Sequence, residues 1–167
     1  MDKKPFVTLE QLREIERTYP TPFYLYDEKG IRENAARLKQ AFSWNRGYKE
    51  YFAVKATPNP FLLNILKDMG CGTDCSSMTE LMMSRACGFS GSDIMFSSND
   101  TPPEEFAYAE KLGAIINLDD ITHIQCLEET LGHIPETISC RYNPGGVFEL
   151  SNGIMDNPGA VSYTHLR

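Results

Sequence analysis

Short apolar runs alternate with longer amphipathic runs through most of this chain of 167 residues. The short runs have the length of buried strands. The longer runs repeat apolar residues at helical spacing, as Ile31, Ala35, Leu38 and Phe42 do. Strands that alternate with helices in this way build parallel sheets, because each helix carries the chain back to the start of the next strand. The expected fold class is therefore α/β.

Six strand-like runs and five helical runs follow one another along the sequence. The strand-like runs are 23–26, 51–54, 71–75, 94–96, 114–118 and 137–142. The helical runs are 28–42, 61–69, 77–86, 102–112 and 119–131. Signals for helix ends support several of them. Ser77 and Glu80 have the spacing of a capping box, Thr101 precedes a proline that suits a first helical position, and Gly70 and Gly113 are natural stops.

Two architectures fit this order of elements, a doubly wound sheet and part of a (β/α)8 TIM-type barrel. The chain contains no G-x-G-x-x-G and no G-x-x-x-x-G-K sequence, the glycine-rich phosphate loops of Rossmann and P-loop folds. The barrel is therefore favoured. A closed barrel needs eight strands and roughly 200 residues or more, so we expect about five of the eight β/α units. Such an open barrel exposes an edge strand and should be poorly stable by itself.

Composition narrows the classes of partner. Hydrophobic residues make up 41% and charged residues 23%, as in ordinary globular proteins. The net charge is −7 without any basic stripe, so nucleic acid is not an expected partner. No apolar run approaches the roughly 20 residues that span a bilayer, and the first residues lack the apolar stretch of a signal peptide. Five cysteines without paired spacing fit a cytoplasmic location, and Cys71 and Cys75 lack the further ligands of a metal site.

Lys55 ends the apolar run Tyr51-Phe52-Ala53-Val54. A residue there lies at the C-terminal mouth of a parallel strand, where the active sites of β/α barrels are found. A lysine partly removed from water loses its proton more readily, and the neutral amine attacks aldehydes. Position alone leaves two interpretations, a nucleophile or a lysine that marks the strand end and reaches solvent, and it favours the second.

The sequence around Lys55 changes that balance. Residues 52–60 read FAVKATPNP, which resembles the Schiff-base lysine motif of the fold-type III pyridoxal phosphate-dependent decarboxylases, Y-A-V-K-A-N-P-N-P in the diaminopimelate decarboxylase branch. Thr57 stands where that family usually has Asn, and Ser98 replaces a family glycine. Other segments resemble family motifs in the same order: T-P-x-Y-V-Y-D at 21–27, D-x-x-S-x-x-E-L at 74–81, F-x-G-N at 96–99, I-N-x-D at 116–119 and R-x-N-P-G at 141–145.

The resemblance implies an enzyme that uses pyridoxal 5′-phosphate to decarboxylate a small amino acid. Lys55 would be the catalytic residue and would bind the cofactor as a Schiff base. Asp74 would lie near the cofactor and that lysine, and Arg141 close to the cofactor's ring face or phenolic oxygen. For Asp74 a solvated strand-end carboxylate, and for Arg141 a surface arginine, remain the alternatives. Ser77 is expected mainly to cap a helix, and Asn99 is a weaker candidate because loop asparagines often only make turns.

The resemblance also predicts the domain organisation. Residues 1–22 would be an N-terminal extension, residues 23–159 a partial alanine racemase-like cofactor-binding barrel, and residues 160–167 a non-native tail. The family's ring-stacking histidine, glycine-rich phosphate loop, E-P-G-R segment and C-terminal β domain would be missing. His123, His133 and His165 do not match the family's histidine motif and receive no role. The full-length enzyme is expected to be a homodimer with shared active sites, and this part of it to be inactive.

The activity implied is decarboxylation of meso-diaminopimelate to L-lysine. Related decarboxylases of ornithine, arginine or carboxynorspermidine are alternatives, as is a non-catalytic barrel that binds pyridoxal phosphate. An alanine racemase is disfavoured, because its lysine is typically followed by A-x-A-Y-G-H-G whereas residues 56–60 read ATPNP. A chain that does not fold, and so has no activity, is the last alternative.

Overall fold

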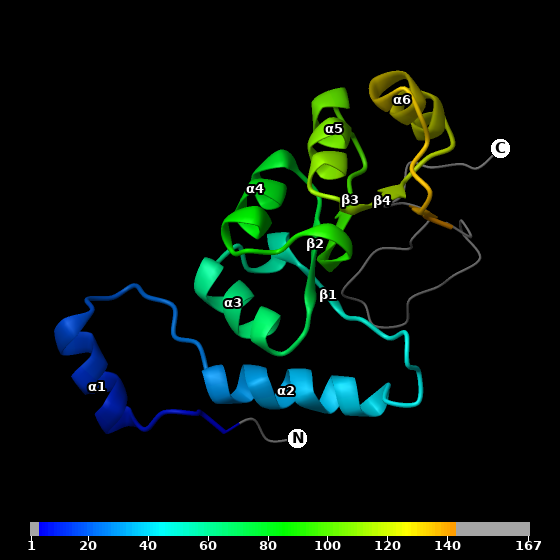
Figure 1. The fold of residues 1–167 in the computed structure, drawn as a ribbon. Coiled ribbons are helices and arrows are strands. Elements are labelled where there is room, and N and C mark those ends of the chain that lie inside the picture. Colours follow the sequence, from blue (N-terminus) through cyan, green and yellow to red (C-terminus); the bar gives the residue numbers. More distant parts are fainter. Residues whose placement is uncertain (1–3, 143–167) are drawn as a thin grey trace.

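The computed structural model describes residues 4–142 (Figure 1). The end of the predicted barrel at 143–159, the predicted tail at 160–167 and His165 lie outside these residues. The helices are α1 (Leu9–Thr18), α2 (Glu28–Ala41), α3 (Pro60–Asp68), α4 (Met78–Ala86), α5 (Pro103–Lys111) and α6 (Thr122–Leu131). The strands are β1 (Tyr51–Ala53), β2 (Gly72–Cys75), β3 (Ile94–Ser97), β4 (Ile115–Leu118) and β5 (Ile138–Cys140). Short 3-10 turns, η1 (Val54–Ala56) and η2 (Gly91–Asp93), follow β1 and precede β3.

The five strands form one parallel sheet in the order β1-β2-β3-β4-β5, so each strand pairs with the next strand of the chain. The helices α3, α4, α5 and α6 each connect two neighbouring strands. This confirms the α/β class and gives the strand order of a β/α barrel. Among residues 4–142, β1 and β5 pair on one side only, and the sheet is therefore open.

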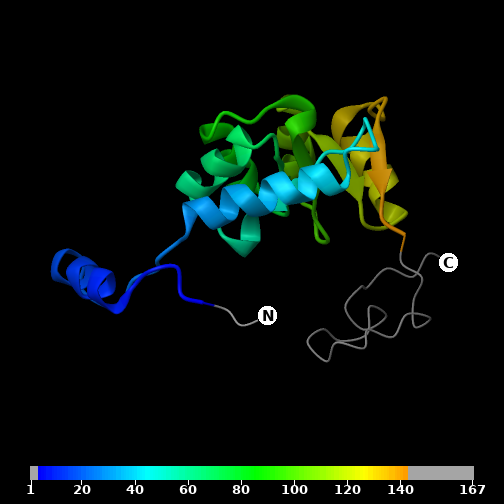
Figure 2. The same ribbon diagram turned by 90° about the horizontal axis from the view of Figure 1, so that it is seen from below.

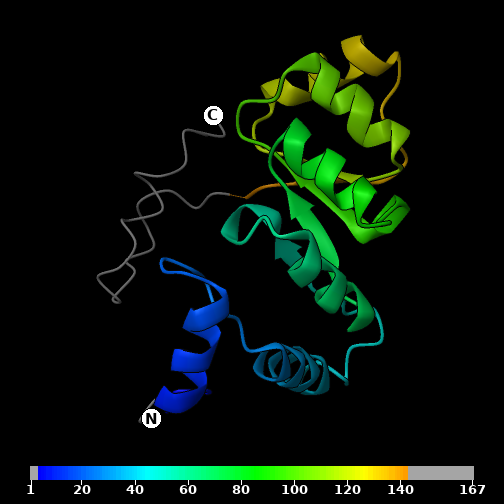
Figure 3. The same ribbon diagram turned by 90° about the vertical axis from the view of Figure 1, so that its left-hand side faces the viewer.

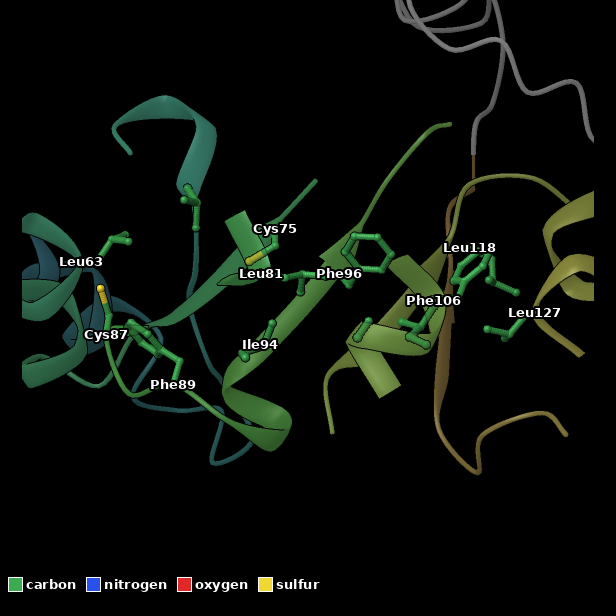
Figure 4. Close-up of a cluster of buried hydrophobic side chains, with 13 residues drawn as sticks. Leu63, Cys75, Leu81, Cys87, Phe89, Ile94, Phe96, Phe106, Leu118 and Leu127 are labelled. Atoms are coloured by element: carbon green, nitrogen blue, oxygen red, sulfur yellow. The ribbon is translucent and has the colours of Figure 1, made fainter. Parts of the chain in front are cut away.

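One face of the sheet carries the hydrophobic core. Successive side chains of a strand point to opposite faces, and Ile94 and Phe96 of β3 are 0% and 1% exposed. Helices α3, α4 and α5 lie in a row along this face (Figure 3). Figure 4 shows the cluster that they bury against it. The cluster consists of Val54, Leu63, Cys75, Leu81, Cys87, Phe89, Ile94, Phe96, Phe106, Ala109, Ile116, Leu118 and Leu127.

Local hydrogen bonds set the helix ends where the sequence signals lie. The Asn59 side chain accepts a bond from the Phe61 N–H at the start of α3, and Ser77 caps α4 as predicted. The Glu80 carboxylate, however, accepts the N–H of Ser76, so the capping box is not reciprocal. Gly70 and Gly113 follow α3 and α5 with positive φ angles of 84° and 71°, a conformation that other residues rarely adopt.

The predicted strand at 23–26 is wrong. This segment has no regular secondary structure, and its residues Tyr24 and Tyr26 are 89% and 43% exposed. Its aromatic composition favours a strand, yet a strand forms only beside a partner, and none of the described strands pairs with it. The two tyrosine rings stack on each other instead, with centroids 6.3 Å apart.

Helices α5 and α6 begin later than predicted. Pro103, not Pro102, takes the first position of α5, because a residue before proline is driven out of the helical region and Pro102 is extended with ψ 147°. Helix α6 starts at Thr122, whose N–H and hydroxyl both donate to the Asp120 carboxylate. Asp119, predicted to lie in this helix, precedes it.

Helix α1 was not predicted, although Thr8 and Gln11 form a reciprocal capping box at its start. None of its residues is buried. Figure 2 shows α1 standing apart from the sheet and its helices. Its apolar residues, such as Leu9 at 65% exposure, therefore contribute little to the core described above.

We expect Phe106→Ala to lower the free energy of unfolding by about 3–5 kcal/mol, because Phe106 is 1% exposed and its removal leaves a cavity against Phe96. Urea denaturation of the intact protein measures this change in the free energy of unfolding. Phe61→Ala is the matched control, since Phe61 is 81% exposed on α3. Equal losses for the two variants would contradict the assignment of the core.

Candidate functional site

The carboxyl ends of the five strands meet at one edge of the sheet, because all strands are parallel. The face opposite the core carries the alternate residues of each strand. In register, Asp74 of β2 lies between Ala53 and Met95, and Ser97 of β3 lies beside Asn117. These side chains are half-buried. The face that the core leaves free therefore carries the polar side chains of Asp74, Ser97 and Asn117 among apolar ones, toward the strand ends where barrel sites form.

Lys55 lies at this edge, in the turn η1 that follows β1. The sequence predicted that Lys55 ends the strand. In the structure β1 ends at Ala53, and Lys55 lies in the short turn that begins at Val54. Val54 is fully buried in the core, and its carbonyl oxygen accepts the N–H of Thr57 at 3.1 Å. The buried Val54 side chain thus anchors the turn to the core, while the Lys55 side chain is exposed.

Asp74 of β2 interacts with Ser97, Lys55 and Arg141. Its Oδ1 atom is buried and has no hydrogen-bond partner among the described residues. Burial raises the pKa of its carboxyl above the ordinary value, while a hydrogen bond from Ser97 and the charges of Lys55 and Arg141 lower it. Three residues that the sequence singled out are thus close enough to act on one another electrostatically.

Arg141 follows β5. Its backbone N–H donates to the Leu118 carbonyl at 2.8 Å, which continues the pairing of β4 and β5. Its Nη1 atom lies 2.8 Å from Oδ1 of Asp119. The Asp119 side chain is 5% exposed and that of Arg141 35%. Arg141 is therefore tied to a buried carboxylate and does not extend freely into solvent.

Asp119 and Ser97 were not predicted as site residues. A signal existed for each. Asp119 directly follows an apolar strand, at the same edge as Lys55, and Ser97 occupies the strand position that alternation places on the face of Asp74. Their relation to Arg141 and Asp74 depends on strand register, which the sequence does not show.

Ser77 and Asn99 follow the carboxyl ends of β2 and β3 by two residues each. Ser77 caps α4, and Asn99 is an exposed residue beyond β3. His123, which received no role from the sequence, is half-buried with its ring against Phe106. His133 is exposed and lies 2.7 Å from Glu110.

The residues at this edge suit the cofactor that the sequence suggested. Lys55 offers an amine to an aldehyde, the buried Oδ1 of Asp74 can still accept a hydrogen bond, and Arg141 keeps N–H groups for an oxyanion. Within residues 4–142, no three His, Cys, Asp or Glu side chains gather as metal ligands. In the same range, no helix is long and apolar enough to cross a membrane.

Comparison with known proteins shows that the residues of this strand edge lie within a segment that matches a known protein family. The family model described as "Pyridoxal-dependent decarboxylase, pyridoxal binding domain" matches residues 28–150. Protein TabA of Pseudomonas amygdali pv. tabaci is 40% identical over 141 residues, which are 84% of this chain and 32% of that protein. Diaminopimelate decarboxylase of Thermoplasma acidophilum is 33% identical over 132 residues, 79% of this chain and 31% of that protein.

A solved structure agrees with these sequence matches. The structure of diaminopimelate decarboxylase from Helicobacter pylori in complex with L-lysine superposes with a TM-score of 0.71 at 31% identity, over 80% of this chain and 34% of that one. The sheet is therefore part of a (β/α)8 barrel of the kind found in that enzyme. The chain spans about a third of the length of the relatives that it matches.

We expect Asp74→Asn to stabilise the cofactor-free protein at neutral pH. Because the pKa of Asp74 is raised in the folded state, the folded protein holds this proton more tightly than the unfolded chain. The contribution of the Asp74 carboxyl to the free energy of unfolding is fully present below its ordinary pKa of 3.8. This contribution is lost as pH rises from that pKa through the raised pKa of the folded state. Urea denaturation at a series of pH values measures the loss, which the Asn variant should remove.

Asp120→Asn provides a control of opposite sign. Hydrogen bonds from the Thr122 hydroxyl and N–H hold the pKa of Asp120 below its ordinary value, so this variant should lose stability at neutral pH. A neutral-pH loss for Asp74→Asn as well would refute the idea that burial of the Asp74 charge is unfavourable.

Proposed function

We propose that this chain, which belongs to the pyridoxal-dependent decarboxylase family, carries the reactive lysine of an enzyme that decarboxylates meso-diaminopimelate to L-lysine. One observation carries the proposal. Lys55 stands in the turn after β1, beside the strand that carries the half-buried Asp74, whose register partner is Ala53. An amine, a carboxylate and a guanidinium thus gather at one strand edge of a pyridoxal-binding domain.

Lys55 would bind the cofactor covalently and give up that bond to the substrate's amine. When bound, pyridoxal phosphate supplies an electron sink for the charge left on the α-carbon as carbon dioxide departs. Two contacts fix the turn that carries Lys55. The Val54 side chain is fully buried, and the Val54 carbonyl accepts a hydrogen bond from the Thr57 N–H. The amine is then held at a constant place above the sheet, which favours reaction by proximity.

Asp74 and Arg141 would set the charge around that amine. The Asp74 carboxylate lies one strand from Lys55, since Ala53 and Asp74 are register partners. Its ionised form would favour a protonated nitrogen at Lys55, and its free oxygen would accept that proton's hydrogen bond. Arg141, on the far side of the sheet edge, would offer N–H donors to an oxyanion.

The substrate rests on the relatives. Diaminopimelate decarboxylases are 33% and 31% identical to this chain in the sequence and structure comparisons above. Protein TabA carries a different name at 40% identity, so a related decarboxylase of ornithine, arginine or carboxynorspermidine is the second candidate. We further propose that the whole enzyme is a homodimer whose sites are shared between subunits.

We expect borohydride reduction of the intact protein loaded with pyridoxal phosphate to attach the cofactor to Lys55. Reduction makes the carbon–nitrogen bond permanent, so mass spectrometry of a digest identifies the lysine. Lys55→Ala should lose both the adduct and the visible absorption band of the bound cofactor. Lys29→Ala is the control and should keep both, since Lys29 lies on α2 and pairs with Glu33. An adduct on another lysine would sink the assignment.

A substrate panel separates the two candidates. Carbon dioxide release by the intact protein should be at least about tenfold faster, in kcat/KM, with meso-diaminopimelate than with ornithine, arginine or carboxynorspermidine, because a difference of about 1.4 kcal/mol in transition-state binding gives that ratio. A reversed preference would favour the second candidate. Cofactor binding without release from any of them would point to a non-catalytic binding protein.

A further inference from the structure

The ion pair between Asp119 and Arg141 joins the ends of two neighbouring strands. Leu118 and Cys140 are register partners, and the Arg141 N–H bond to the Leu118 carbonyl extends that register by one step. Asp119 and Arg141 therefore lie side by side just beyond β4 and β5. Their charged atoms are 2.8 Å apart, with the carboxylate almost completely removed from water.

Surroundings distinguish this pair from the other ion pairs in the part of the chain that the structure describes. In the pair of Lys29 with Glu33 on α2 both side chains are mostly exposed, and such pairs contribute little. A carboxylate that is 5% exposed needs a partner, because an unpaired buried charge is strongly unfavourable. The Asp119 side chain therefore holds its guanidinium partner firmly.

A guanidinium is planar and carries five N–H donors in a fixed arrangement. When Asp119 engages Nη1 and the backbone of Arg141 is fixed by Leu118, the plane of the group is restricted at both ends. The remaining donors then point in a constant direction at the strand edge.

We propose that Asp119 is the positioning residue for Arg141, holding its guanidinium at the strand edge so that its free N–H groups bind an oxyanion of the cofactor. This inference rests on the proposed function, because the oxyanion belongs to pyridoxal phosphate. Asp119 acts through Arg141 and does not touch the cofactor. Loss of its charge should therefore weaken cofactor binding only where Arg141 is present.

A double-mutant cycle on the intact protein tests this. Dissociation constants for pyridoxal phosphate are measured by equilibrium titration for the parent, Asp119→Asn, Arg141→Ala and the combined variant. We expect Asp119→Asn to weaken binding about tenfold, as loss of about 1.4 kcal/mol would do, and to have no further effect beside Arg141→Ala. Asp119→Glu should restore most of the affinity. Asp120→Asn, one residue away and bonded to Thr122, should leave it unchanged.

Each outcome decides the question. An unchanged dissociation constant in Asp119→Asn overturns the inference, and so does an equal loss with and without Arg141, which would mean that Asp119 acts by another route. Thermal unfolding of each apoprotein identifies variants that fail to fold, and Asp119→Glu and Arg141→Lys then complete the cycle. If the parent protein binds no pyridoxal phosphate, the proposed function fails first, and that result is distinct from the others.

Discussion

Burial of one sheet face beneath α3 to α6 is the constraint on which the site depends. Side chains alternate along each strand, so every residue sent into this core sends its neighbours to the opposite face. The candidate residues are accordingly each adjacent in sequence to a buried one: Lys55 to Val54, Asp74 to Cys75, and Asp119 to Leu118. Packing at the core therefore fixes the backbone that carries the polar groups, and a rigid scaffold of this kind is what precise placement requires.

The fold was largely predictable from the sequence because its signals are local. Apolar periodicity indicates the five core strands and the helices between them, and glycines such as Gly70 mark helix ends. Where the outcome depended on a partner or on a neighbour's sterics, the prediction failed. The run at 23–26 lacks a strand to pair with, and Pro103 shifts the start of α5. Helix α1 was not predicted although Thr8 and Gln11 have the spacing of a capping box, and none of its residues is buried.

The sequence proposed site residues by type but showed nothing of their geometry. Motif resemblance singled out Lys55, Asp74 and Arg141, and their roles stay predictions; in the structure Asp74 lies in β2, Lys55 follows β1 and Arg141 follows β5. The carboxylate beside Arg141 stands in the matched segment I-N-x-D at 116–119, but the resemblance assigned no role to Asp119. Its pairing with Arg141 and its burial distinguish it from Asp120, which accepts hydrogen bonds from Thr122 at the start of α6. Both properties arise only after folding.

The sequential strand order has a consequence for how this region can form. Because each strand pairs with the strand of the next β/α unit, as Tyr51 does with Gly72 and Ile116 with Ile138, every pairing closes a loop of similar, modest length. Contact order is therefore low for a parallel sheet, and no pairing has to wait for a distant segment. A chain emerging from the ribosome can add one unit at a time to an edge that is already ordered. Assembly from the N-terminal side would complete the neighbours of Lys55 before those of Arg141.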